Sequence, residues 1–70
     1  MVFKKELMLK RLRSEGLMHL VGSKEMAIMN NLDGQEVTAS SWNRQVNDIP
    51  VYSCRGKDGK YYDVNEADCV

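Results

Sequence analysis

Cysteine, histidine, proline and long apolar runs are all scarce in this 70-residue chain. Cys54 and Cys69 are too few for the disulfide framework of a small secreted domain, so two reduced thiols are expected, with a Cys54–Cys69 bridge as the alternative. One histidine, His19, and no Cys-x-x-Cys pair predict no metal site. No apolar run approaches the roughly 18 residues of a membrane span, and the charged start is unlike a signal peptide. These absences predict a soluble cytoplasmic protein that needs no cofactor.

Charge is balanced, with ten Lys and Arg against ten Asp and Glu. A protein that coats nucleic acid through bulk charge alone would be strongly basic, so the charge balance argues against this class. The basic residues are instead concentrated in the first 24 residues and again near residues 55–60. A chain of this length forms one domain, residues 1–70, with a modest core.

The first half of the chain predicts a helix, a short strand and a second helix. Good helix formers fill residues 3–15, and Gly16 stands where a glycine would end that helix. A brief strand is predicted over 17–21, because the apolar run there is too short for a helix of its own. The second helix is predicted over 23–32, with Ser23 as its N-cap.

A third helix of about ten residues is predicted to begin after Thr38 and to end at Pro50. Trp42, Val46 and Ile49 are spaced by four and three residues, which places them on one helical face. We expect that face to be buried.

The end of the chain predicts a β-hairpin over 51–64, because Asp58-Gly59 is a strong turn signal between two strand-like runs. A loop of two or four residues would divide the strands into two faces. The predicted faces are Val51, Ser53, Tyr62 and Val64 on one side, and Tyr52, Cys54, Tyr61 and Asp63 on the other.

Two runs resemble the winged helix-turn-helix regulators of the biotin-repressor and DeoR groups. VTASSWNRQVNDI, from Val37, resembles the turn and recognition helix of that family, and IPVYSCRGKDGKYYDV resembles its wing. SKEMA, which opens the second predicted helix, is similar to the equivalent helix start. The chain departs from the family in an extra DGQE before the third helix and in a shorter link to the wing. The resemblance, which covers residues 23–64, implies an α+β winged helix-turn-helix domain in the order helix, short strand, helix, helix, hairpin.

The resemblance also implies binding to double-stranded DNA, with the third helix in the major groove and the hairpin on the phosphate backbone. Arg and Asn side chains can read base edges, Ser can bond bases or phosphates, and basic side chains neutralise phosphates. The expected DNA-binding residues are Ser40, Ser41, Asn43, Arg44, Asn47, Arg55, Lys57 and Lys60. So few cations predict a weak monomer, so a homodimer or a larger partner protein is expected. A small bacterial or phage transcription regulator is the function this implies.

The alternative function is a winged-helix module that binds protein, of the inhibitor or antirepressor type. Tyr52 and Tyr61, on one predicted hairpin face, are aromatics of the kind interfaces use, and Trp42 would join them if exposed. An enzyme is not expected, because a domain this small leaves little room for a pocket that excludes water.

Overall fold

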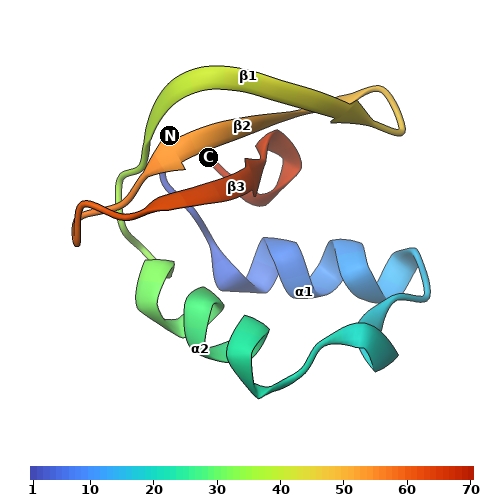
Figure 1. Ribbon diagram of the computed structural model, residues 1–70. Helices are drawn as coiled ribbons and strands as arrows, with labels where there is room; N and C mark the ends of the chain where they lie inside the picture. Colours follow the sequence, from blue (N-terminus) through green and yellow to red (C-terminus); the bar gives the residue numbers. More distant parts are fainter.

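The computed structural model describes residues 1–70 as two α-helices followed by a three-stranded antiparallel sheet (Figure 1). The α+β class predicted from the sequence is confirmed, but the order of elements is not that of a winged helix. The elements are α1 (Lys5–Ser14), the 3₁₀ turn η1 (Met18–Leu20), α2 (Ser23–Leu32), β1 (Thr38–Val46), β2 (Ile49–Arg55), β3 (Tyr61–Asn65) and the 3₁₀ turn η2 (Glu66–Asp68).

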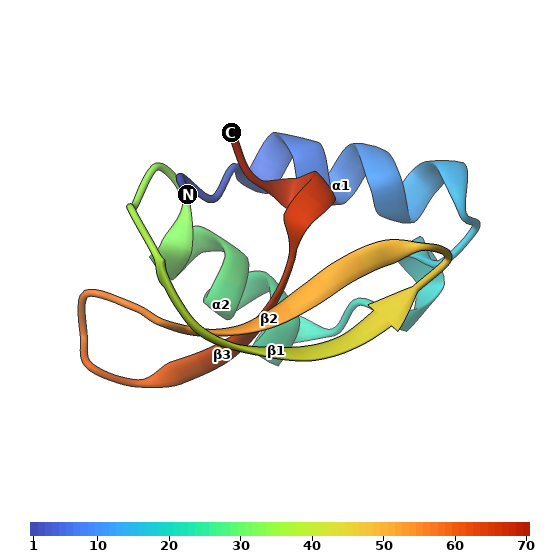
Figure 2. The ribbon, with the colours of Figure 1, turned by 90° about the horizontal axis from the view of Figure 1, so that it is seen from above.

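The helices and the sheet form two layers. In Figure 1 the strands lie above the helices in the order β1, β2, β3, so that β3 is nearest to them and β1 is the far edge. Figure 2, turned by 90°, shows the sheet from its edge with α1 beside it. β1 is the strand farthest from both helices in Figure 1.

Backbone hydrogen bonds tie the two layers together at the chain ends. Residues 1–4 pair with residues 34–37 on one side and with residues 68–70 on the other, a three-way contact that we call the terminal seam. The N–H of Val2 donates to the carbonyl of Val70 at 2.9 Å, and the reverse bond has the same length. The seam places Phe3, which is 3% exposed, in the centre of the core.

The core is small and draws on every layer. α1 and α2 each present an apolar stripe, as the spacing of their leucines and methionines predicts. Its seven buried residues are Phe3, Leu12, Met29, Leu32, Val37, Cys54 and Val64. Burying one such side chain contributes about 1.5–3 kcal/mol before conformational entropy is subtracted.

Both predicted helices in the first half are confirmed. α1 ends before Gly16, whose φ of +70° is the left-handed conformation that glycine adopts at low cost. α2 begins at Ser23, but its N-cap is Gly22, whose N–H donates to the Glu25 side chain at 3.1 Å.

The predicted strand over 17–21 is wrong. Met18–Leu20 forms a 3₁₀ turn, with the N–H of Leu20 bonded to the carbonyl of Leu17 at 3.0 Å. The chain reverses direction here between α1 and α2, and no neighbouring strand is available to pair with it.

The predicted third helix is also wrong, because residues 38–46 form β1. Asn47 and Asp48 have φ of +49° and +64°, the signature of a two-residue type I′ hairpin turn, and Val46 pairs with Ile49 across it. The run also contains mostly poor helix formers, Thr, Ser, Trp, Asn and Val. The spacing of Trp42, Val46 and Ile49 therefore does not report a buried helical face.

The predicted β2–β3 hairpin around Asp58-Gly59 is confirmed, but its register differs from the expectation. Arg55 pairs with Tyr61, so the loop over 56–60 has an odd number of residues instead of the expected two or four. Each side chain of β3 therefore lies on the opposite face of the sheet from the one predicted. The observed faces are Tyr52, Cys54, Tyr62 and Val64 on one side, and Val51, Ser53, Tyr61 and Asp63 on the other. Tyr52 and Tyr61 consequently lie on opposite faces, and the predicted aromatic face does not exist.

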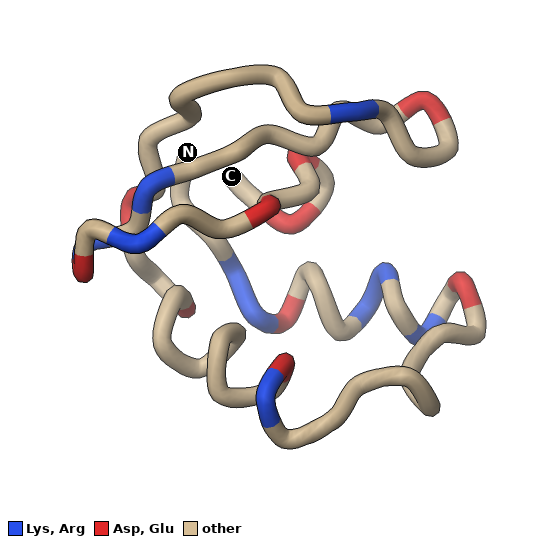
Figure 3. The backbone as a smooth tube through the Cα atoms, viewed as in Figure 1, with Lys and Arg blue, Asp and Glu red and all other residues tan.

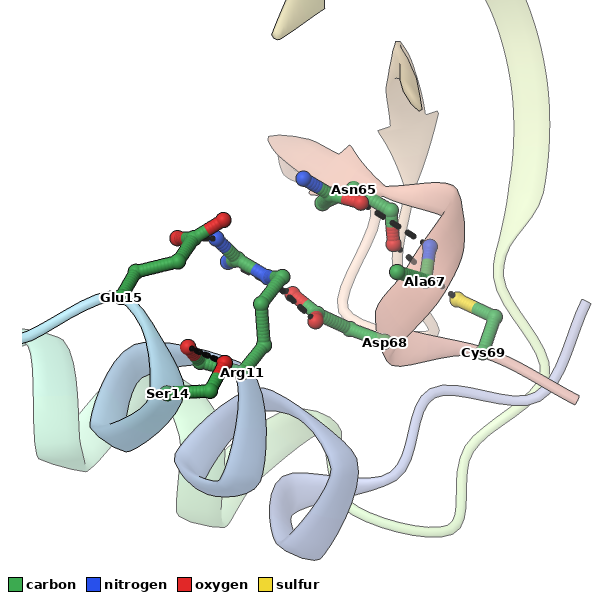
Figure 4. Close-up of polar contacts among 7 residues, drawn as sticks. All are labelled: Arg11, Ser14, Glu15, Asn65, Ala67, Asp68 and Cys69. Carbon is green, nitrogen blue, oxygen red and sulfur yellow. Dashed lines mark hydrogen bonds and ion pairs between the residues drawn. The ribbon is translucent and has the colours of Figure 1, made fainter. Parts of the chain in front are cut away.

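A largely buried ion pair connects α1 to η2 (Figure 4). The Nε of Arg11 donates to Asp68 Oδ1 at 2.8 Å and its Nη2 donates to Oδ2 at 3.1 Å, while Asp68 is only 2% exposed. The hydrogen bond that the Arg11 guanidinium donates to Asp68 raises the pKa of Arg11 above its ordinary value. The last turn of α1 is thereby fixed against η2.

Substituting Asp68→Asn should lower the free energy of unfolding by about 2–3 kcal/mol, because a partly buried guanidinium loses its charged acceptor. Urea denaturation would measure this loss. Glu15→Gln is the matched control, since Glu15 bonds the same arginine at 3.1 Å from a more exposed position, and it should cost at most about 0.5 kcal/mol. Equal losses in the two variants would contradict the assigned importance of the Asp68 contact.

Candidate functional site

β1 is the most exposed element of the structure. All nine of its residues are exposed, on both faces of the strand. The largest is Trp42, which is 60% exposed although it sits opposite Tyr52 in the register. Antiparallel sheets ordinarily have at least one face covered, so an uncovered strand with an exposed tryptophan is a candidate contact surface.

The residues predicted to bind DNA are spread along the sheet and do not form one cluster. Figure 3 shows basic residues at the β2–β3 loop and, toward the other end, on β1, whereas Ser41 pairs with Ser53, two residues from Arg55. Ser40, Ser41, Asn43 and Arg44 lie on β1, and Asn47 lies in the turn that follows it. Arg55 ends β2, and Lys57 and Lys60 lie in the β2–β3 loop. The seven residues of β2 separate the two ends by roughly 20 Å, so a base-reading helix beside a wing is not what the structure presents.

The polar residues of β1 are bonded to the neighbouring strands. Asp63 of β3 accepts from Arg44 at 3.1 Å and from the Asn43 amide at 3.0 Å. Ser40 donates to the carbonyl of Ser53 at 2.8 Å. The charge of Arg44 is thus neutralised within the sheet, and contact with a guanine would have to compete with this pair. The sequence reading missed Asp63 because it placed Arg44 and Asn43 on a helix.

The basic group at the other end is free of ion pairs. Arg55, Lys57 and Lys60 are all exposed, and none belongs to the three ion pairs of the structure. Arg55 and Lys57 line a polar depression of about 640 Å³ where the β2–β3 loop meets residues 34–36. Glu36 also lines it, so the depression carries both signs of charge.

Asp58 shapes the loop that carries these cations. Its carboxylate accepts from the Tyr62 hydroxyl at 2.5 Å and from the Lys60 N–H at 3.0 Å. The Tyr62 hydrogen bond is the main cause that lowers the pKa of Asp58, and the same bond raises the pKa of Tyr62. Gly59 supplies the φ of +81° that the turn requires.

Neither cysteine is placed for chemistry. Cys54 and Cys69 are both free thiols, and Cys54 is buried. Burial raises the pKa of each thiol, that of Cys69 to about 11, so both are protonated at neutral pH.

The structure offers no metal-binding cluster. His19 is exposed, and no cluster of three or more His, Cys, Asp or Glu residues could hold a metal ion. Neither α1 nor α2 has the length or apolar character to cross a membrane.

These features define a small α+β protein with one uncovered strand and a separate basic loop. No family model, curated protein or solved structure matches this chain.

The Asp58 carboxylate should titrate below the ordinary aspartate value of about 3.9. Because its folded-state pKa is lowered, its contribution to stability is present above the unfolded pKa and is lost as the pH falls through the folded value. Carbon-13 NMR of the Asp58 carboxyl group between pH 2 and 6 would measure the midpoint. Tyr62→Phe removes the main donor and should move the midpoint upward; an unchanged midpoint in that variant would contradict the assigned cause.

Proposed function

We propose that this protein is a small, non-enzymatic interaction module that binds another protein through β1. The observation that carries the proposal is that β1 exposes all nine of its side chains, including Trp42, and no other element covers it. Few residues of this chain are buried, so an exposed tryptophan forgoes folding free energy that burial of its large apolar side chain would supply.

Trp42 has the properties of an interface anchor. Tryptophan is enriched among residues whose truncation costs about 2–4 kcal/mol of binding, because its large rigid ring is buried at little entropic cost. Val46, 37% exposed, pairs with Ile49 and so lies on the opposite face of the sheet from Trp42, which pairs with Tyr52. Trp42 is therefore the single large apolar side chain that β1 exposes on its own face. The exposed polar residues Ser41 and Asn43 flank Trp42 along the strand, as polar residues flank the apolar centre of a protein interface.

The electrostatics of β1 favour an uncharged partner surface. Arg44 is the one charged residue of the strand, and Asp63 already neutralises it at 3.1 Å. A nucleic acid would gain little electrostatic binding energy from this strand, because its one cation is already paired. An apolar patch on a partner protein could bind here without burying an unpaired charge.

Contact through side chains is favoured over the addition of a partner strand. The β1–β2 register shifts between Ala39 and Ser41 and again between Trp42 and Arg44. Such bulges interrupt the row of free N–H and C=O groups on an edge strand and protect it from pairing.

Substituting Trp42→Ala should weaken binding of the captured partner about 30-fold or more, as expected for loss of an anchoring aromatic. The protein would be immobilised, retained proteins identified, and the affinity of the purified partner measured by calorimetry. Leu20→Ala is the matched control, since Leu20 is 65% exposed but lies in the turn between the helices.

An amide NMR spectrum would establish that both variants keep the fold. Wild-type affinity in Trp42→Ala, or an equal loss in Leu20→Ala, would overturn the assignment of the surface.

Binding to double-stranded DNA is a second candidate, and a specific observation favours it. Arg55, Lys57 and Lys60 are three exposed cations at one end of the sheet, none in an ion pair. Phosphate contacts from these residues would give affinity without sequence information. A homodimer would double the number of such contacts, and a regulatory role in bacteria or phage stays a prediction.

Three phosphate contacts should make the affinity for a random duplex fall with a slope of about −2.7 in a plot of log affinity against log salt concentration. Fluorescence anisotropy from 20 to 200 mM salt would measure it. The double variant Lys57→Ala, Lys60→Ala should lose most of this binding, and Lys10→Ala, Lys24→Ala, which removes two exposed lysines from the helices, should retain it. No binding at 20 mM salt, or the same loss in both double variants, would exclude this candidate.

A further inference from the structure

A groove of about 620 Å³ lies between the sheet and the helices, and Trp42 is not among its lining residues. α1 contributes Met8 to its wall, α2 contributes Ile28 and Met29, and the face of the sheet that carries Asn65 contributes Val46 and Val51. Most of its lining is apolar, and its volume falls within the roughly 300–1,000 Å³ typical of sites for small molecules.

The charged groups at the groove are already neutralised or bonded. Arg11 is paired with Asp68 at 2.8 Å, and Arg44 is paired with Asp63 at 3.1 Å. The remaining charged group, Glu25, accepts a hydrogen bond from the N–H of Gly22 at 3.1 Å. A charged ligand would find no unpaired cation here and would compete with existing pairs, so the groove is complementary to an uncharged occupant.

Asn65 supplies a directed polar group. It is 8% exposed and lines the groove, and its Oδ1 accepts from the N–H of Ala67 at 2.9 Å, which fixes the side chain as the N-cap of η2 (Figure 4). The Nδ2 of Asn65 donates to no group in the protein. Because no buried side-chain nitrogen or oxygen lacks a partner, this amide must reach accessible space, and the groove is the space that Asn65 lines.

We propose that the groove binds an uncharged, largely apolar small molecule that carries a carbonyl-type acceptor, with Asn65 Nδ2 as the donor to it. The apolar walls supply most of the binding affinity, and the single amide donor fixes the orientation of the ligand, as is typical of small-molecule sites. The site goes beyond the protein-binding function proposed for β1 and does not include Trp42.

Two neutral fluorescent probes test the proposal. Prodan is a naphthalene with a ketone, and N-phenyl-1-naphthylamine has a similar apolar body without a carbonyl. Titration of the wild-type protein with Prodan should give saturable binding and a blue shift of its emission. In the NMR spectrum of the same titration, the side-chain amide signals of Asn65 should move.

Variants separate the wall from the donor. Ile28→Gln should weaken both probes, and Leu20→Gln, at an exposed position outside the groove, should weaken neither. Asn65→Asp keeps the acceptor that caps η2 but removes the donor, so it should weaken Prodan about fivefold or more and change N-phenyl-1-naphthylamine less than twofold. Trp42→Ala should leave both affinities unchanged, which distinguishes failure here from failure of the β1 proposal.

The proposal is overturned if wild-type protein shows no saturable binding, or if Leu20→Gln weakens the probes as much as Ile28→Gln does. Equal losses of both probes in Asn65→Asp would overturn the role of the amide donor. If Asn65→Asp does not fold, the wild-type titration decides, because unmoved Asn65 amide signals at saturation would contradict the assignment.

Discussion

The terminal seam is the constraint on which the rest of the structure depends. The first four residues are bonded to both residues 34–37 and residues 68–70, so one short segment joins the end of the helical layer to the end of the sheet. Phe3 enters the core from this segment, and the Arg11–Asp68 pair fixes the far end of α1 to the same C-terminal turn. The sheet turns its β3 edge toward the helices and β1 is the strand farthest from them (Figure 1), so the seam supplies much of the connection between the two layers. The position of β3 above the helices, and hence the groove beneath it, follows from this closure.

The elements that local sequence signals control could be predicted, whereas β1 and the register between strands, which depend on long-range strand pairing, could not. α1, α2 and the Asp58-Gly59 hairpin each carry a helix-forming run, a glycine stop or a turn pair. The helix predicted over residues 38–46 rests on the spacing of three apolar residues, whereas most of the other residues of this run have low helix propensity and the run forms β1. Spacings of four and three residues do not exclude a strand that is exposed on both faces, since such a strand has no buried side to impose alternation. Asn47-Asp48 was the signal that could have corrected the reading, because both residue types tolerate the positive φ of a type I′ turn.

The candidate site was predictable only in part, for a related reason. The sequence marks Trp42 as an interface residue if it is exposed. Whether it is exposed depends on the element that contains it, because the predicted helix would bury it whereas β1 leaves it 60% exposed. Arg44 and Asn43 were assigned to DNA on the assumption of a helix, whereas the strand brings them to Asp63, a residue 19 positions further along the chain from Arg44. Asparagine is a common N-cap residue, so the capping role of Asn65 has a sequence signal. Its place beside the groove has none, because that depends on the fold. Long-range partners of this kind are set by register, which short sequence patterns do not encode.

The odd length of the 56–60 loop has a consequence for how this chain can vary. Val64 is buried and Asp63 is exposed only because five residues separate the paired positions Arg55 and Tyr61. Removing or adding one residue would exchange the two faces of β3, turning a carboxylate toward Met29 and Leu32 and a valine toward water. Natural or engineered insertions in this loop should therefore be tolerated in steps of two residues, even though the loop itself is exposed and polar.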